Sequence, residues 1–263
     1  MQDQGVNRLE EIEILTPGQR LREIRRKLGL RQEDLAGKNL SKNYISMFEN
    51  DKRRISIINA TYLSQKINEI AKEKGLDFRV ASNYFIKSEI DIVKDKCLEW
   101  LEQCKKSEVN DNYRVYSNMY GAIFLAKKYE LLDILADSYF LKGCYLYNNK
   151  LYSCAIIHFS QSLFYYTKSG EIEREGNCYF NMAKVYYKME YYDLAISYFN
   201  LAGATKKIDK EEISYYKALS FYKLKEYRLA KSTLDNILLR DGKTLELENS
   251  ISKKLTKDEK KTM

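Results

Sequence analysis

The residues best suited to chemistry in this sequence are basic side chains concentrated near the N-terminus. Between Arg20 and Arg54 lie eleven basic and five acidic residues. This local excess of positive charge, in a chain of 263 residues with a net charge of +8, favours binding to an anionic partner. Lys52, Arg53 and Arg54 end the cluster as a basic triplet, which suits phosphate contacts that position a protein without reading a base sequence.

Covalent chemistry is not indicated by the other residue types. The chain has one histidine, His158, and five cysteines that form no CxxC pair, which is a poor ligand set for zinc. Phosphate-binding glycine loops and HExxH motifs are absent from the sequence. We therefore expect no enzyme activity, no cofactor and no metal. The lack of an apolar run of about 20 residues and the lack of a secretory leader predict a cytoplasmic protein without membrane association. In that setting the odd number of cysteines indicates reduced, mostly packed thiols.

Short helices are predicted to position the basic segment. Thr16 is expected to be a helix N-cap, with Pro17 at the first helical position and Gln19 completing a capping box. Apolar residues then recur at helical spacing until Gly29, which is suited to a left-handed helix stop. Further helices are predicted over 31–36, over 42–50 with Ser41 as the cap, and over 56–74.

The segment from residue 20 to residue 56 resembles the Cro/phage-repressor (XRE) helix-turn-helix family. The resemblance is carried by RLREIRRKLGLRQEDLAG and SKNYISMFENDKRRIS, and within them by Arg25, Gln32, Leu35, Ala36, Tyr44, Ile45, Ser46 and Glu49. Asp51 stands where the family usually has a glycine in a left-handed turn, a conformation that aspartate tolerates. We expect Arg25 and Glu49 to form an internal ion pair that orients the helices.

The resemblance implies a recognition helix whose first side chains reach base edges in the major groove of DNA. By analogy, Asn43 suits adenine, Lys42 suits guanine and Met47 can touch a thymine methyl group. Gln32 would lie near a phosphate at the start of the second helix. The DNA-binding set implied by the family pattern and by the basic triplet is Gln32, Ser41, Lys42, Asn43, Tyr44, Met47, Lys52, Arg53 and Arg54.

The second half of the sequence repeats itself. Segments 136–168, 176–207 and 211–239 align on small residues in a first helix and on an alanine in a second helix, with alanine spacings of 40 and 35 residues. The aligned positions are Gly143, Ala183 and Ala218, then Ala155, Ala195 and Ala230, then Phe159, Phe199 and Leu234. This pattern resembles the tetratricopeptide repeat, in which small residues allow close helix packing and large ones fill the gap to the next helix pair.

Polar residues line one stripe of a first helix in these repeats. Asn177, Asn181, Lys184 and Lys188 follow helical spacing and would face the concave groove of the solenoid. Asparagine satisfies both donors and acceptors of a peptide backbone, and lysine attracts carboxylates. Together with Asn148 and Tyr216 from the flanking repeats, they form a candidate peptide-binding set. The alternative is an ordinary polar helix face without a ligand.

The sequence therefore predicts an all-α protein with an N-terminal helix-turn-helix domain followed by a right-handed, tetratricopeptide-like solenoid. We expect domains over 1–76 and 77–249 and a disordered basic tail over 250–263. The layout resembles the Rgg/PlcR/PrgX group of peptide-responsive quorum-sensing regulators, which implies a homodimer on a palindromic operator and a short peptide ligand. Two alternatives remain: repeats that bind a protein partner or only dimerise, and a scaffold that has lost DNA binding.

Overall fold

The chain folds into two compact units, Met1–Glu99 and Trp100–Met263. The computed structural model describes residues 14–37, 40–106, 112–205, 208–238 and 240–262, so Lys38 of the basic cluster lies outside the described residues. Within these ranges every regular element is a helix, which confirms the all-α prediction. No described helix is both long and apolar enough to cross a membrane.

The first unit begins where the sequence predicts a helix start. Its helices are α2 (Pro17–Lys27), the 3-10 helix η1 (Gln32–Leu35), α3 (Lys42–Glu49), α4 (Ile57–Glu73) and the 3-10 helix η2 (Ser82–Phe85). The Thr16 hydroxyl accepts a hydrogen bond from the Gln19 backbone at 3.1 Å, and the Gln19 side chain accepts one from the Thr16 backbone at 2.8 Å. This is the predicted capping box. Gly29 follows α2 with a φ of +65°, the predicted left-handed stop.

The core of this unit extends beyond the predicted boundary at residue 76. Val80 and Phe85 are buried in the same apolar cluster as the α2, α3 and α4 side chains. Asn68 on α4 also bonds both backbone groups of Val80, donating at 2.9 Å and accepting at 2.8 Å. The boundary at 76/77 is therefore wrong, because the segment that follows α4 folds back and completes the first core.

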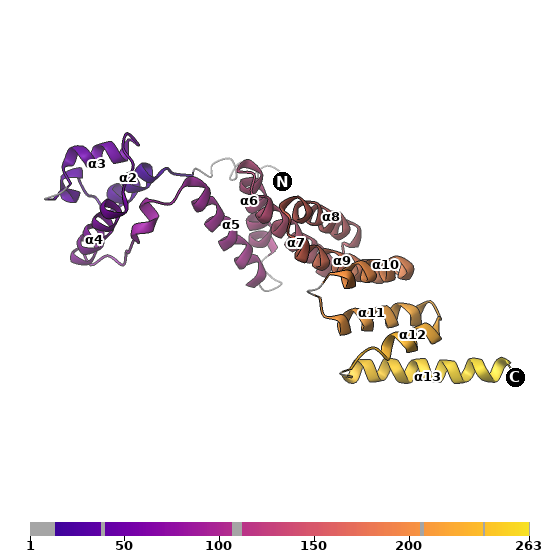
Figure 1. Ribbon diagram of the computed structural model, residues 1–263. Coiled ribbons are helices and arrows are strands. Elements are labelled where there is room, and N and C mark those ends of the chain that lie inside the picture. The colour runs from indigo at the N-terminus through magenta and orange to yellow at the C-terminus, as the bar shows by residue number, and fades with distance from the viewer. Residues whose placement is uncertain (1–13, 38–39, 107–111, 206–207, 239, 263) are drawn as a thin grey trace. The chain divides into compact units, whose positions relative to one another are not determined.

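The boundary between the two units falls within helix α5 (Glu89–Lys106), between Glu99 and Trp100, and helix α6 (Asn112–Lys128) follows α5 in the sequence. Three hairpins of helices then succeed one another: α7 (Leu132–Asn148) with α8 (Tyr152–Ser169), α9 (Ile172–Lys188) with α10 (Tyr192–Ala204), and α11 (Lys210–Lys223) with α12 (Tyr227–Leu234). Each helix of these hairpins packs mainly on its neighbours in the sequence (Figure 1), as expected for a helical-repeat domain.

The turn inside each hairpin is built the same way without glycine. Lys150, Glu190 and Lys225 adopt left-handed φ values of 61°, 65° and 64°. In the first hairpin the Leu151 N–H then donates to the Leu146 carbonyl at 2.9 Å, and equivalent bonds close the other two turns. A left-handed residue other than glycine costs about 1–2 kcal/mol, which helix packing must offset.

Small residues pack the hairpins as the repeat alignment predicts. The nine aligned positions are buried: Gly143, Ala183, Ala218, Ala155, Ala195, Ala230, Phe159, Phe199 and Leu234. At Gly143, a Cβ atom would lie 2.7 Å from the Phe159 ring, so only glycine lets α7 and α8 approach this closely.

The last helix corrects the prediction of a disordered tail. Helix α13 spans Gly242–Thr262, and only Met263 of the predicted tail lies outside the described residues. Leu247, Ile251 and Leu255 recur every four residues and pack against the apolar cluster of the last hairpin. The segment is helical because the final repeat leaves an apolar face that needs a cover.

Candidate functional site

The candidate recognition helix α3 divides into a buried side and an exposed side. Ile45, Phe48 and Glu49 are buried against the domain core. The opposite side and the loop after the helix expose eight of the nine predicted DNA-binding residues: Ser41, Lys42, Asn43, Tyr44, Met47, Lys52, Arg53 and Arg54. Ser41 has the extended backbone of an N-cap, but its side chain accepts no capping hydrogen bond. Folding thus gathers on one surface the side chains that the sequence assigns to DNA.

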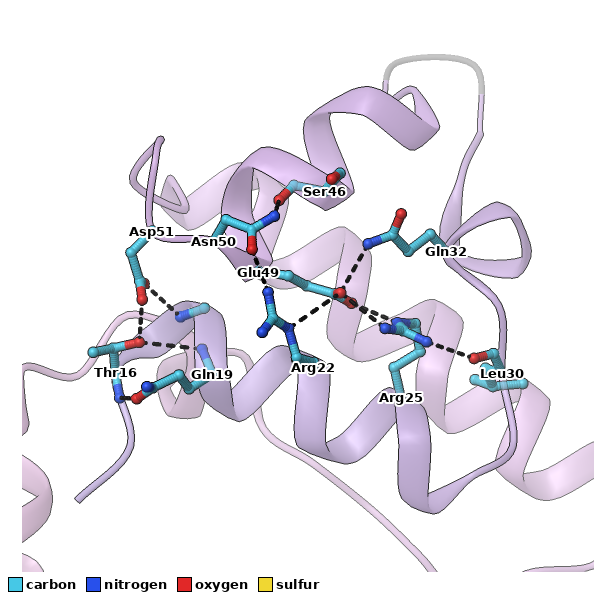
Figure 2. A network of polar contacts seen from close by, with 11 residues as sticks. Thr16, Gln19, Arg22, Arg25, Leu30, Gln32, Ser46, Glu49, Asn50 and Asp51 are labelled. Carbon is cyan, nitrogen blue, oxygen red and sulfur yellow. Dashed lines mark hydrogen bonds and ion pairs between the residues drawn. The ribbon is translucent and has the colours of Figure 1, made fainter. Parts of the chain in front are cut away.

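A buried carboxylate fixes the orientation of α3 on α2. Glu49 accepts hydrogen bonds from Arg25 Nε at 2.5 Å, from Arg25 Nη2 at 2.9 Å and from Gln32 Nε2 at 2.9 Å (Figure 2). Arg25 Nη1 also donates to the Leu30 carbonyl at 2.8 Å. The predicted Arg25–Glu49 ion pair is confirmed, and its geometry is bidentate.

The charges of this network stabilise one another. Burial by itself would raise the pKa of Glu49, but hydrogen bonds from Arg25 and Gln32 outweigh it and leave that pKa below its ordinary value. The pKa of Arg25 is raised, chiefly by its hydrogen bond to Glu49. Glu49 therefore stays ionised and Arg25 stays charged at neutral pH.

Gln32 takes part in the same internal network. Its amide donates to Glu49 from η1, and the side chain is half-buried, whereas the other predicted DNA-binding residues are exposed. In this structure Gln32 connects the second helix of the motif to the recognition helix. Its predicted position near a phosphate stays a prediction.

A second set of contacts holds the loop that follows α3. Asp51 has a φ of 53°, in the left-handed turn that the sequence predicts. Its carboxylate accepts hydrogen bonds from the Gly18 N–H at 3.1 Å and from the Thr16 hydroxyl at 2.5 Å (Figure 2). A Cβ atom on Gly18 would lie 2.0 Å from the Phe48 carbonyl oxygen, so α2 and α3 meet at a glycine. This clamp joins residues more than thirty positions apart, so local sequence patterns do not predict it, although they do mark Thr16 as a cap and Asp51 as a left-handed residue.

Two cations on the exposed surface have partners within the domain. Lys42 forms an ion pair with Glu33, and both side chains are more than half exposed. Arg53 lies over the Tyr44 ring, with its guanidinium carbon 4.5 Å from the ring centroid. Tyr44 therefore orients Arg53, while Lys42 has to exchange one anionic partner for another when it binds a ligand.

One member of the basic cluster is internal. Arg20 is 1% exposed, donates a hydrogen bond to the Lys87 carbonyl and lies 5.3 Å from the Tyr84 ring centroid. Its burial lowers its pKa from the ordinary arginine value. Arg20 therefore connects α2 to the segment after α4. It counts toward the charge of the basic cluster in the sequence, but it is not exposed.

The predicted peptide-binding residues lie on the first helices of the three hairpins, a surface that we call the first-helix face. Asn148, Asn177 and Lys188 are exposed, and Asn181 donates a hydrogen bond to the Asn177 carbonyl of its own helix at 2.8 Å. The Tyr216 ring lies 5.5 Å from the Lys184 ammonium. The structure thus brings Lys184 and Tyr216, the predicted residues from two helices, into contact.

Two aromatic residues that the sequence analysis missed complete the surroundings of Lys184. Its ammonium lies 5.4 Å from the Phe180 centroid and 5.9 Å from the Tyr147 centroid. Tyr147 carried a signal, because a tyrosine recurs five residues later and the same pair occurs in each hairpin: Tyr147 with Tyr152, Tyr187 with Tyr192, and Tyr222 with Tyr227. The recurrence of these tyrosine pairs in the sequence does not predict which cation contacts each ring.

Comparison with known proteins identifies the first domain. Residues 21–69 match HTH_3, the helix-turn-helix family, which confirms the helix-turn-helix domain predicted from the sequence. The crystal structure of Bacillus thuringiensis PlcR in complex with the peptide PapR7 and DNA aligns with 92% of this chain and 88% of that chain, at 16% identity and a TM-score of 0.39. Comparison with curated proteins gives no match.

Proposed function

We propose that this chain is a cytoplasmic, sequence-specific DNA-binding transcription regulator whose repeat domain dimerises and binds a short peptide that modulates DNA binding. The observation that carries the DNA-binding part is the exposed face of α3. Lys42, Asn43 and Met47 project from a helix whose other side is fixed by the Glu49 network. A recognition helix needs this combination, because base readout requires side chains that are free to reach DNA on a backbone that does not move.

The exposed residues divide into two chemical roles. Asn43 offers the paired donor and acceptor that match the major-groove edge of adenine. Arg53, oriented by Tyr44 at the end of α3, offers a positive charge suited to a phosphate of any sequence. The two roles predict different kinds of defect, which makes them separable by experiment.

Asn43→Ala is expected to lose about 1–3 kcal/mol of affinity for duplexes selected from a randomised library, and to relax the preference at one base pair. Arg53→Ala is expected to weaken binding to selected and random duplexes alike, and to lower the slope of log affinity against log salt by about one. Fluorescence anisotropy over a range of salt concentrations measures both effects. The matched control is Asn200→Ala, which removes an exposed asparagine from α10. Wild-type binding by both variants would contradict the assigned recognition surface.

Dimerisation would place two recognition helices on a palindromic operator, since one helix reads too few bases to be selective. Exposed apolar side chains on the second helices of the hairpins support a dimer through the repeats. Ile157 and Phe164 lie seven residues apart on α8, Leu194 and Leu201 lie seven apart on α10, and Leu229 lies on α12. Analytical ultracentrifugation of the protein with the same selected duplexes is expected to give two chains per duplex at saturation. One chain per duplex would contradict the dimer.

The peptide part of the proposal rests on the first-helix face. Three neighbouring helices about 10 Å apart span the length of roughly five to ten extended residues. The row of amides and amines across them suits the backbone and end groups of such a peptide. A peptide that binds all three helices would change how the hairpins stack, and thereby the spacing of the two recognition helices in a dimer.

The double variant Asn177→Ala/Asn181→Ala is expected to lose peptide binding while it keeps its fold and its DNA affinity in the absence of peptide. Alanine favours a helix more than asparagine does, so α9 should not be weakened. The probe is a pooled library of random heptapeptides, and peptides retained by the wild-type protein are tested by calorimetry. Unchanged affinity in the double variant would place the peptide site elsewhere. If the wild-type protein retains no peptide, repeats that bind a protein partner or only dimerise become the better explanation.

A further inference from the structure

Lys184 has the most unusual surroundings of any lysine on the first-helix face. Its ammonium lies between 5.4 and 5.9 Å from the centroids of three rings: Tyr147 on α7, Phe180 on its own helix α9, and Tyr216 on α11. The side chain is half-buried. All three hairpins therefore contribute to the surroundings of this one charge.

The charge of Lys184 is not neutralised from within the described part of the chain. No carboxylate in the described ranges forms an ion pair with it, whereas Arg174 on the same helix pairs with Asp137 at 2.6 Å and with Glu171 at 2.8 Å. The nearby Cys144 thiol is neutral at neutral pH, because burial raises its pKa to about 11. The charge is therefore met by cation–π contacts, which contribute about 0.5–2 kcal/mol.

The aromatic rings around Lys184 limit which kind of anion can bind to its ammonium group. Burial also raises the pKa of Tyr147 and of Tyr216, so the hydroxyl groups of both rings stay protonated beside Lys184. A phosphate would leave most of its charge unmatched here, because phosphate sites use arginine forks or several backbone N–H groups. A single carboxylate needs one strong cationic donor and tolerates apolar neighbours. The aromatic walls also suit an apolar side chain attached next to that carboxylate.

We propose that Lys184 is the anchor for a carboxylate of the peptide ligand, with the C-terminal carboxylate as the first candidate and the last side chain lying against Tyr147 and Tyr216. This inference rests on the proposed peptide function. It adds the chemistry that binds one end of the ligand. An acidic side chain offers the same carboxylate chemistry from a second source.

The test compares two libraries of random heptapeptides, one with free C-termini and one with amidated C-termini. Lys184→Met removes the charge and keeps a long apolar side chain. Lys231→Met is the matched control, because Lys231 is an exposed lysine on α12, a second helix that does not belong to the first-helix face. Affinity selection identifies retained peptides, and calorimetry then measures the best of them as both acid and amide against each protein.

We expect Lys184→Met to weaken binding of the free-acid peptide by about 10- to 100-fold, the effect of losing one charge-assisted hydrogen bond. Amidation should weaken binding to the wild-type protein to a similar degree and should have no further effect on Lys184→Met. Lys231→Met should stay within about threefold of wild type, and Lys184→Arg should retain most of the affinity. An affinity that depends on Lys184 and on an internal acidic residue, but not on amidation, would identify an acidic side chain as the source of the carboxylate.

The failures of the two proposals are distinguishable. If peptides bind and need Asn177 and Asn181 but bind Lys184→Met as tightly as wild type, the anchor is wrong and the peptide function stands. If the wild-type protein retains nothing from either library, the peptide function itself fails. Thermal unfolding of Lys184→Met checks the fold, and the melting temperature should change little, because methionine keeps an apolar side chain against the rings.

Discussion

Replacing Glu49 by alanine is expected to lower the free energy of unfolding of the helix-turn-helix domain by about 3–5 kcal/mol. Glu49 is 2% exposed and accepts hydrogen bonds from Arg25 and Gln32. Its removal leaves the Arg25 guanidinium largely buried without its anion, and that penalty makes the effect large. Hydrogen exchange of the full-length chain, resolved to the peptides of α2 and α3, measures it as a loss of protection of about a hundredfold or more.

Two variants make this result interpretable. Glu33→Ala removes the exposed partner of Lys42 and should cost less than about 1 kcal/mol. The double variant Arg25→Met/Glu49→Leu removes the whole buried pair and should recover most of the lost stability, because apolar residues of similar size need no counter-charge. A Glu49→Ala variant no less stable than Glu33→Ala would show that the network contributes nothing to the domain.

The same network predicts how stability depends on acid. The pKa of Glu49 is lowered in the folded state from its ordinary value of 4.5. The stability that its ionisation provides is therefore fully present above pH 4.5 and is lost as the pH falls through the lower, folded-state value. Protection of α3 should accordingly decrease in that acidic range for the wild-type protein and change less for the double variant Arg25→Met/Glu49→Leu.

Replacing Phe159 by alanine is expected to destabilise the repeat domain by about 3–5 kcal/mol. The ring is completely buried between α7 and α8, directly against Gly143 and 5.6 Å from the Phe140 ring centroid. Gly143 has no side chain that can fill the resulting cavity. Trp100 is the only tryptophan in the chain and lies in the second unit, so its fluorescence follows denaturant unfolding of this domain.

The control for this prediction lies on the same helix. Phe164 is 60% exposed, so Phe164→Ala should change the stability of a single chain by less than about 0.5 kcal/mol. The comparison is made at a protein concentration where both variants are in the same oligomeric state, since Phe164 belongs to the proposed dimer surface. Equal effects of the two substitutions would contradict the packing of α7 on α8.

Local chemistry in the sequence determined most of the helix boundaries. The Thr16 capping box, the left-handed stop at Gly29 and the left-handed turn at Asp51 are all formed as predicted, since each depends on residues within a few positions of one another. The repeat alignment predicted the buried small residues for a similar reason. Close helix packing excludes a Cβ at Gly143 whatever the rest of the chain does.

The site was determined in part. Helical spacing and family resemblance placed Lys42, Asn43 and Met47 on one exposed face, and the same resemblance led to the pairing of Arg25 with Glu49. Arg20 shows where such reasoning ends. It was counted in the basic cluster, but the segment around Tyr84 and Lys87 folds over it and buries it.

Only the tertiary structure decided the features that depend on distant segments. The core of the first unit reaches Phe85, and α13 is an ordered helix, because in both places an apolar surface left by earlier helices is covered by later residues. The surroundings of Lys184 combine rings from three helices, and the outermost two, Tyr147 and Tyr216, are 69 residues apart in the sequence. Spacing within one helix fixes which way a side chain points. It does not determine which residues that side chain contacts, because those contacts depend on how whole helices pack against one another.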